Sequence, residues 1–162
     1  MYVKKLACAI VALTCASPVF AEDKLFDATS APSVAAALQE AGYKALVKTG
    51  PDGDPYIVSS ANGEDFTIEF YGCKDGHCPS MQLTSWYKAE PLWTPALTNE
   101  WNADKRFLRI GVDSKGQLHE YLDLTSTGKL TQANFADWVD WYQVMDTSLA
   151  KFIAEKRAAA KK

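Results

Sequence analysis

The chain has 162 residues, and its 20 acidic and 17 basic side chains give a formal net charge of −3 at pH 7. This mild acidity suits solubility and argues against a nucleic-acid partner, which attracts clustered Lys and Arg. The one basic cluster, 151–162, is mixed with Ala. We interpret it as a solvated helix end rather than a membrane-binding surface, because its apolar face fades after Ile153.

The N-terminus has the pattern of a signal peptide over residues 1–21. Two lysines precede Leu6–Ala16, which is apolar and uncharged, and small residues lie just before Glu22. This pattern predicts cleavage between Ala21 and Glu22. The apolar stretch is too short to span a bilayer. We therefore expect a periplasmic or secreted protein with no stable membrane insertion, and a retained anchor is the less favoured alternative.

One domain is predicted over residues 30–156, between a flexible leader at 22–29 and a basic tail at 157–162. Apolar periodicity near two indicates strands within it, and periodicity near 3.6 indicates helices. The predicted elements, in chain order, are a helix to Gly42 capped by Ser30, strands at 43–48, 56–60, 65–71 and 80–88, a helix capped by Thr94 or Thr98, strands at 107–113 and 118–125, and a helix capped by Thr131. This order is typical of an α+β fold, with helices packed on an antiparallel sheet.

Two of these segments carry the clearest pattern. Strands 56–60 and 65–71 are joined across Asn62-Gly63, a strong signal for a hairpin. In the second strand Phe66, Ile68 and Phe70 alternate with polar residues, so they are predicted to face the core. In the final helix an apolar stripe is predicted to do the same; it contains Phe135, Trp138, Val139, Tyr142, Met145, Leu149, Phe152 and Ile153.

Cys73 and Cys78 are the cysteines that remain after signal-peptide removal, with the turn Asp75-Gly76 between them. In an oxidising compartment such a pair predicts a disulfide with a structural role. Redox pairs have two intervening residues ahead of a helix, whereas four intervene here and a strand follows. A zinc site made of both cysteines and His77 is the less favoured alternative, because it needs a fourth ligand.

No standard catalytic constellation is present in the sequence. His77 and His119 are far apart, and the chain has no Gly-x-Ser-x-Gly motif, phosphate-binding glycine loop or paired-histidine motif. The abundant carboxylates are interpreted as solvated surface charge. We therefore expect a protein that is not an enzyme and that uses no metal and no cofactor.

The tryptophans divide into two groups. Trp101 lies four residues after Leu97 on one helix face and is interpreted as a core residue. Trp86 differs, because its strand neighbours of the same parity are polar. We predict that Tyr71 and Trp86 share the sheet face opposite Phe66, as a binding face for a protein or a sugar. The alternative is that a second layer of core covers them.

Several stretches of the chain resemble the exported members of the YbjN family, described as bacterial sensory transduction regulators. The resemblance covers about 30–153 in the same order. Its most specific part is the motif that contains Asn99, Trp101, Asn102, Lys105, Arg106 and Phe107. The other matching stretches are 33–43, 66–73, Asp75-Gly76 with Cys78, and Asn134-Phe135 with Trp141.

The resemblance implies a fold similar to type III secretion chaperones, with a curved antiparallel sheet and helices at its ends. Those chaperones are non-enzymatic, often dimeric, and bind extended segments of other proteins. The family has no established catalytic residues, so the resemblance assigns none. We expect a periplasmic protein-binding, chaperone-like or regulatory module, whose partner is an unknown protein or a second copy. The alternative is a small-ligand or carbohydrate binder, or an enzyme, in which Trp86 and Trp93 form a stacking platform.

Overall fold

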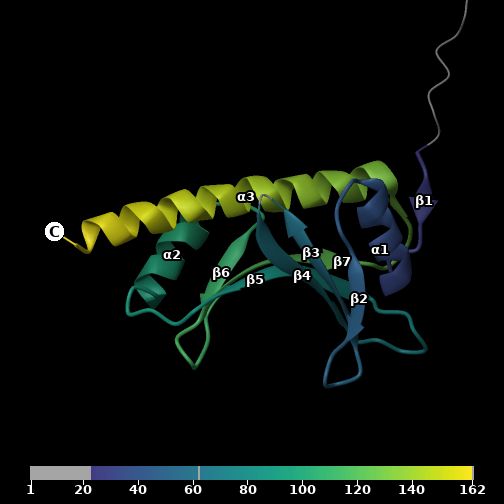
Figure 1. The fold of residues 1–162 in the computed structure, drawn as a ribbon, viewed down its shortest axis with the longest axis horizontal. Helices are drawn as coiled ribbons and strands as arrows, with labels where there is room; N and C mark the ends of the chain where they lie inside the picture. The colour runs from purple at the N-terminus through teal and green to yellow at the C-terminus, as the bar shows by residue number, and fades with distance from the viewer. Residues whose placement is uncertain (1–22, 62, 162) are drawn as a thin grey trace, which may run out of the picture.

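The computed structural model describes residues 23–61 and 63–161, and Figure 1 shows its fold. The predicted signal peptide over residues 1–21 and its cleavage site lie outside the described residues. The helices of the described part are α1 (Ala31–Glu40), α2 (Pro95–Asp104) and α3 (Gln132–Ala159). Its strands are β1 (Leu25–Phe26), β2 (Leu46–Thr49), β3 (Pro55–Ala61), β4 (Glu64–Tyr71), β5 (Ser80–Tyr87), β6 (Arg109–Val112), β7 (Leu118–Thr125) and β8 (Leu130–Thr131).

The longer strands form one antiparallel sheet in the order β2-β3-β4-β5-β7-β6. Helices α1 and α3 lie along one side of this sheet, and the long loops extend away on the other side (Figure 1). Strand β7 lies between β5 and β6, so the last hairpin joins the sheet through its second strand. This arrangement confirms the predicted α+β fold with helices packed on an antiparallel sheet.

The hairpin predicted from Asn62-Gly63 is also confirmed. Strand β3 pairs with β4 in a register that places Ile57 opposite Ile68. Gly63 has a φ of 86°, the left-handed conformation that a tight hairpin turn needs and that glycine adopts without strain. Phe66, Ile68 and Phe70 are all buried, as their alternation predicts.

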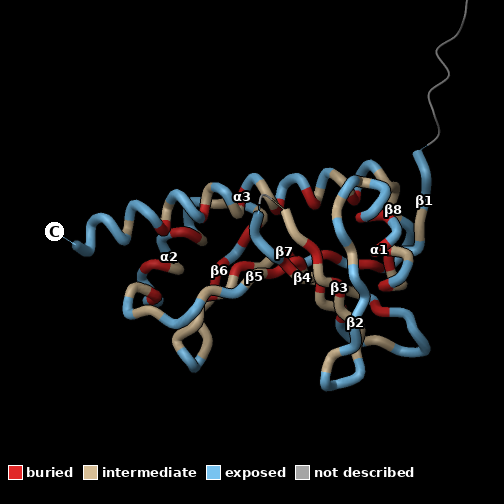
Figure 2. Tube along the Cα trace, viewed as in Figure 1, coloured by how far each residue is buried: buried red, intermediate tan, exposed pale blue. Residues whose placement is uncertain are grey.

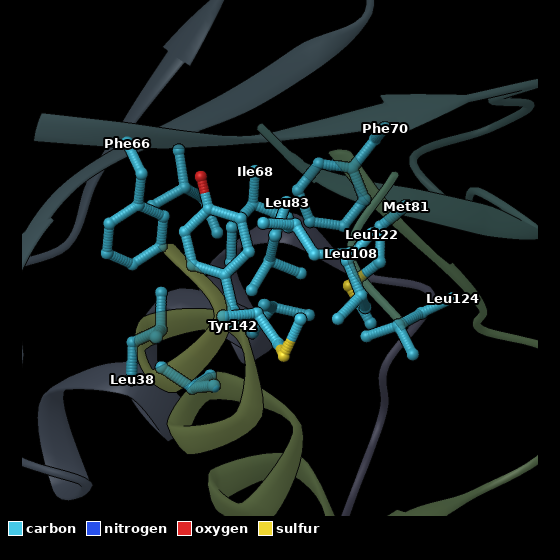
Figure 3. Close-up of a cluster of buried hydrophobic side chains, with 14 of the residues drawn as sticks. Leu38, Phe66, Ile68, Phe70, Met81, Leu83, Leu108, Leu122, Leu124 and Tyr142 are labelled. Carbon is cyan, nitrogen blue, oxygen red and sulfur yellow. The ribbon is translucent and has the colours of Figure 1, made fainter. Parts of the chain in front are cut away.

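The core lies between this sheet and α3 (Figure 2), where buried positions of the helix face buried positions of the strands. Figure 3 shows the Tyr142 ring extending from α3 toward the sheet beside Phe66, and the two ring centroids are 5.3 Å apart. Each large apolar side chain removed from water here contributes about 1.5–3 kcal/mol to stability. Burial of the apolar stripe of α3 against the sheet therefore stabilises this long helix, although the sequence of α3 as a whole is only weakly apolar.

Thr94 and Thr131 cap their helices as predicted, whereas Ser30 lies at the N-cap position of α1 but its side chain makes no capping hydrogen bond. The Thr131 hydroxyl accepts a hydrogen bond of 3.0 Å from the Asn134 N–H at the start of α3, and Thr94 caps α2 in the same way. At the end of α1, Gly42 has positive φ, and the Tyr43 N–H donates to the Leu38 carbonyl. This Schellman arrangement holds Tyr43 against the helix, so the predicted strand at 43–48 begins later, as β2.

The predicted flexible leader is built differently. Residues Leu25–Phe26 form β1, which pairs with β8 in a separate two-stranded sheet. The Phe26 ring packs edge-on against Phe135 of α3 at 5.3 Å, and Ala28 is fully buried. A strand of two residues is too short to produce a periodic pattern, which is why sequence analysis assigned no structure to it.

The predicted basic tail also differs from the expectation of a solvated, fraying end. Helix α3 continues to Ala159. The Arg157 guanidinium pairs with the Glu90 carboxylate and lies over the Trp93 ring, 5.5 Å from its centroid. These contacts connect the end of α3 to the loop between β5 and α2.

Candidate functional site on the open face of the sheet

The sheet presents one face to the helices and one face away from them. We call the second the open face and define it by nine side chains of its central strands: Thr67, Glu69 and Tyr71 of β4, Gln82, Thr84 and Trp86 of β5, and His119, Tyr121 and Asp123 of β7. The register places these residues opposite one another across the three strands. Their alternating neighbours point toward α3, as Figure 3 shows for Ile68 and Leu83. The open face therefore carries mixed aromatic and polar side chains, of which Thr84 at its centre is buried and the others are at least partly exposed.

An aromatic stack crosses one end of the open face. The Trp86 indole stacks on His119 with ring centroids 4.6 Å apart, and His119 stacks on Tyr121 at 5.0 Å. A side chain at Gly111 of β6 would bring its Cβ to 2.7 Å from the His119 ring, so glycine there lets the imidazole lie flat across the strand. Burial lowers the pKa of His119 below its ordinary 6.5, and the ring is therefore neutral at pH 7.

Hydrogen bonds between side chains cross the other end of the open face. The Tyr71 hydroxyl donates to the Glu69 carboxylate at 2.7 Å, and the Gln82 amide donates to Asp123 at 2.8 Å. Partial burial, together with Glu69, raises the pKa of Tyr71, so the phenol stays protonated as a donor. These side chains therefore bond to one another across β4, β5 and β7.

Tyr71 and Trp86 share the open face, which is the face opposite Phe66 that their positions along the strands predict. Their side chains are 41% and 52% exposed, so no second layer of core covers them. They do not form one patch, because Tyr71 lies opposite Ser80, six positions before Trp86 on β5. Six residues of strand span roughly 20 Å. The two aromatic residues therefore mark opposite ends of the open face.

A cavity lies beside each of these aromatic residues. One, of about 300 Å³, lies next to Tyr71 and includes Asp52, Asp54 and Glu69 in its lining. The other, of about 320 Å³, lies next to Trp86 and includes Asp146. A larger hollow of about 560 Å³ lies between α2 and α3, away from the open face, and is lined by residues of both charge signs. The lining of both smaller cavities is acidic, and the cavity next to Trp86 extends to α3 on the helix side of the sheet.

Trp93 is buried, which contradicts the alternative in which it forms an exposed stacking platform with Trp86. Its side chain is only 6% exposed, and its indole N–H donates to the Lys88 carbonyl at 2.8 Å. Its ring packs edge-on against Tyr87. Trp86 and Trp93 therefore do not form a stacking platform. Trp93 lies in an irregular loop, where no periodicity signals burial.

The predicted disulfide between Cys73 and Cys78 is confirmed. Between the two cysteines, Asp75 and Gly76 both have positive φ, and Lys74 and His77 exchange backbone hydrogen bonds around this turn. The His77 Nδ1 lies 2.7 Å from the Thr29 hydroxyl, which fixes the loop to the segment before α1. A bridge closing so short a loop stabilises the fold by about 2 kcal/mol. Because both sulfurs are bonded to each other, they are not thiolate ligands for zinc.

The motif that gave the most specific resemblance joins α2 to β6. The Trp101 indole N–H donates to the Leu108 carbonyl at 3.1 Å. The Asn102 amide donates to the Ile110 carbonyl and its oxygen accepts from the Ile110 N–H, at 2.9 and 3.0 Å. Asn99 is exposed on α2. Trp101 and Asn102 therefore have a structural role, as a connection between helix and sheet.

The end of this motif has an unusual backbone. Phe107 has a φ of 63°, which bulky L-residues rarely adopt. Its ring packs against Trp138 and Trp141 of α3 at 5.8 and 4.8 Å, and the Arg106 guanidinium lies over it at 4.9 Å. These contacts hold the turn in a strained conformation, and β6 begins only at Arg109, two residues later than predicted.

Sequence analysis missed one buried acid, Glu120 of β7. Its side chain is fully buried, and its Oε1 accepts a hydrogen bond of 2.9 Å from the Tyr142 hydroxyl. Burial, together with the nearby Asp146 carboxylate, raises the pKa of Glu120 to about 8. A signal was present: Leu118, Leu122 and Leu124 alternate toward the core, and Glu120 has the same parity. The interpretation of the carboxylates as mostly solvated surface charge therefore does not hold for Glu120.

Within 23–61 and 63–161, no three His, Cys, Asp or Glu side chains are grouped so that they could hold a metal ion. In the same residues, no helix combines the length and the apolar character needed to cross a membrane.

Comparison with known proteins gives one match. Residues 30–151 match the family model YbjN, which is described as "Putative bacterial sensory transduction regulator". No curated protein and no solved structure matches the chain. The matched range contains α1, α2, the six-stranded sheet and most of α3.

Proposed function

The chain belongs to the YbjN family, and on this premise we propose that it is an exported, non-enzymatic module that binds another polypeptide on the open face. Its action is chaperone-like or regulatory: it holds an extended segment of a partner protein or of a second copy. The proposal rests on one observation above all, which is that Tyr71 and Trp86 are exposed on a sheet face opposite the helices.

The composition of the open face supports a polypeptide partner. Tyr and Trp are enriched where proteins meet, because each offers a large apolar ring and a polar group. The hydrogen-bonded residues between them, such as Gln82 and Asp123, provide acceptors and donors for a peptide backbone. The acidic cavity beside Tyr71 adds negative potential at one end of the face. An extended, basic segment matches this surface in length, polarity and charge.

Export is supported by two independent features. The signal-peptide pattern over residues 1–21 directs the chain out of the cytoplasm. The Cys73–Cys78 disulfide is of the kind that persists in an oxidising compartment such as the periplasm. The partner of an exported protein is then expected among periplasmic or secreted chains.

Replacement of Trp86 by alanine tests the proposal. Because the indole is half exposed, the change is expected to alter the free energy of unfolding by only about 0.5 kcal/mol. A central tryptophan in an interface contributes on the order of 2 kcal/mol or more, so partner capture or self-association should weaken about thirtyfold. A thermal melt, sedimentation velocity and capture from periplasmic extract measure these effects on the same variant.

Val144→Ala is the matched control for this experiment. Val144 is a large apolar side chain that is 59% exposed on the outer side of α3, away from the open face. It should leave capture and self-association unchanged. Equal losses in both variants, or none in Trp86→Ala, would contradict the proposal, and collapse of the Trp86→Ala melt would assign the residue to the core.

A further inference from the structure

A connected group of polar side chains lies between α3 and the sheet, inside an otherwise apolar core. We call it the core polar cluster; it consists of Ser85 and Tyr87 of β5, Glu120 of β7, and Tyr142 and Asp146 of α3. Tyr142 and Asp146 are four residues apart, so they share one face of α3. Figure 3 shows that the Tyr142 side chain on this face extends toward the sheet.

Hydrogen bonds within the cluster cross the boundary between helix and sheet. The Tyr142 hydroxyl donates to Glu120 Oε1 at 2.9 Å and lies 2.8 Å from the Ser85 hydroxyl. The Tyr87 hydroxyl donates to the Asp146 carboxylate at 3.4 Å. The Glu120 carboxyl lies within hydrogen-bonding reach of Asp146. The middle of α3 is therefore joined to β5 and β7 by polar contacts as well as by packing.

The contact between Glu120 and Asp146 is a contact between two acids, and it needs a proton. Two ionised carboxylates accept hydrogen bonds only, so they cannot bond to each other, whereas a protonated acid donates. Glu120 Oε2 is buried and receives no hydrogen bond from the described residues. A buried oxygen without a partner is costly, and native proteins rarely leave one so. A proton on Oε2, donated to Asp146, removes this cost.

The surroundings of the two acids favour retention of that proton. Glu120 is fully buried and Asp146 is partly exposed, so Glu120 is the acid that keeps it. Burial, together with Asp146, raises the pKa of Glu120 to about 8, and burial raises the pKa of Asp146 above its ordinary 3.8. The charged group that acts from β4 is a further acid, Glu64, and the β6 residue opposite Glu120 is the buried, apolar Ile110. None of the three acids takes part in the ion pairs of the described residues.

We propose that Glu120 and Asp146 share one proton and that this acid pair is a pH-sensitive latch between β7 and the middle of α3. With the proton present, the Glu120 acid donates to the Asp146 carboxylate and holds the helix on the sheet. Without it, two negative charges face each other in a poorly solvated place, and the middle of α3 opens more often. The latch acts without any partner polypeptide, so it goes beyond the proposed function.

The latch weakens as pH rises. When α3 is open and Glu120 is solvated, its pKa returns toward the ordinary 4.5, whereas in the closed state it is about 8. Between these values the closed state keeps a proton that the open state has lost, so each increase in pH favours opening. Within this window, one pH unit changes the opening equilibrium by at most about tenfold. The hold on α3 is thus complete below about pH 4.5 and has declined to its minimum above about pH 8.

Amide hydrogen exchange in the full chain tests the latch at individual N–H groups. Met145 lies beside the latch on α3, and Ile153 lies about two turns further along the same helix. Between pH 6 and pH 8 the protection factor, which corrects for the intrinsic exchange rate, should fall about tenfold or more at Met145 and less than about threefold at Ile153. Glu120→Gln has an amide donor that does not titrate, so it should abolish the fall at Met145.

Two outcomes of the exchange experiment would overturn the latch. One is a protection factor at Met145 that does not change with pH. The other is an equal fall at Ile153, because it would indicate opening of the whole core rather than of the middle of α3. This comparison needs no variant, so it holds even if Glu120→Gln does not fold.

Carboxyl titration separates the acid pair from burial of Glu120 alone. In ¹³C NMR of the full chain, Asp146→Asn should lower the titration midpoint of the Glu120 carboxyl by about one pH unit, because a neighbouring negative charge is removed. Asp137→Asn, which changes an exposed acid of α3 outside the cluster, should leave the midpoint unchanged. An unchanged midpoint in Asp146→Asn would show that burial acts alone, and it would overturn the shared proton.

Discussion

Trp101→Ala is expected to lower the free energy of unfolding by about 3–5 kcal/mol, the range for truncation of a buried aromatic residue. Trp101 is 1% exposed, and its ring packs against Phe152 of α3 with centroids 5.5 Å apart. Its indole N–H also bonds the Leu108 carbonyl. Alanine therefore leaves a cavity and an unpaired carbonyl where α2 meets α3 and the residue before β6. The melting temperature should fall by roughly 10–20 °C.

Two variants separate packing from hydrogen bonding at this position. Trp101→Phe keeps most of the ring and removes the indole N–H, so it should cost clearly less than the alanine variant. Trp141→Ala removes a tryptophan that is 40% exposed and should cost less still. Calorimetry or denaturant titration measures the series. An alanine variant that melts with the parent chain would show that Trp101 lies at the surface.

Glu120 is expected to make the stability of the parent chain fall as pH rises. In the folded chain the pKa of Glu120 is about 8, above its ordinary 4.5. Between these values the folded state keeps a proton that the unfolded state has lost. Stability from this group is thus complete below about pH 4.5 and decreases toward pH 8, by at most about 1.4 kcal/mol per pH unit.

Glu120→Gln mimics the protonated acid at every pH. The variant should gain stability relative to the parent chain as pH rises from 5 to about 8, so the difference between the two profiles should increase with pH. Chemical denaturation at a series of pH values gives this difference. Asp137→Asn, an exposed acid on the same helix as Asp146, should show a flat difference. A flat difference for Glu120→Gln as well would contradict a buried, protonated Glu120.

The predicted parts of the fold are those that local patterns specify. The hairpin of β3 and β4 follows from two alternating strands and one glycine turn, and the caps Thr94 and Thr131 follow from side chains that bond nearby N–H groups. The stripe of α3 is equally local, since positions three and four apart share a face. These features need no knowledge of which strands pair.

The features that sequence analysis missed depend on contacts distant in sequence. Strand β1 forms because Phe26 meets Phe135, more than a hundred residues away. The strained backbone at Phe107 exists because two tryptophans of α3 hold its ring. Burial of Glu120 is the exception, since parity with its leucine neighbours could have revealed it.

The candidate site was predictable in the same limited way. The alternation of side chains along each strand alone predicted that Tyr71 and Trp86 share one face. The pairing of β4 with β5 then shows that Tyr71 lies opposite Ser80, far from Trp86 along β5. The cavity next to Trp86 depends on where the pairing of β4 with β5 ends, and no local pattern specifies that position. The acids that line it come from β4 and α3, so only the assembled fold brings them together.

The most direct test of the central claim, that the open face holds another polypeptide, is photo-crosslinking in cells. The replacement Tyr71→p-benzoylphenylalanine puts a crosslinker on the open face with little change in shape, and the same replacement at Val144 samples the outer side of α3. Irradiation before lysis should join a second polypeptide, another protein or a second copy, to position 71 and none to position 144. Crosslinks at position 144 alone, or at neither position, would contradict the claim.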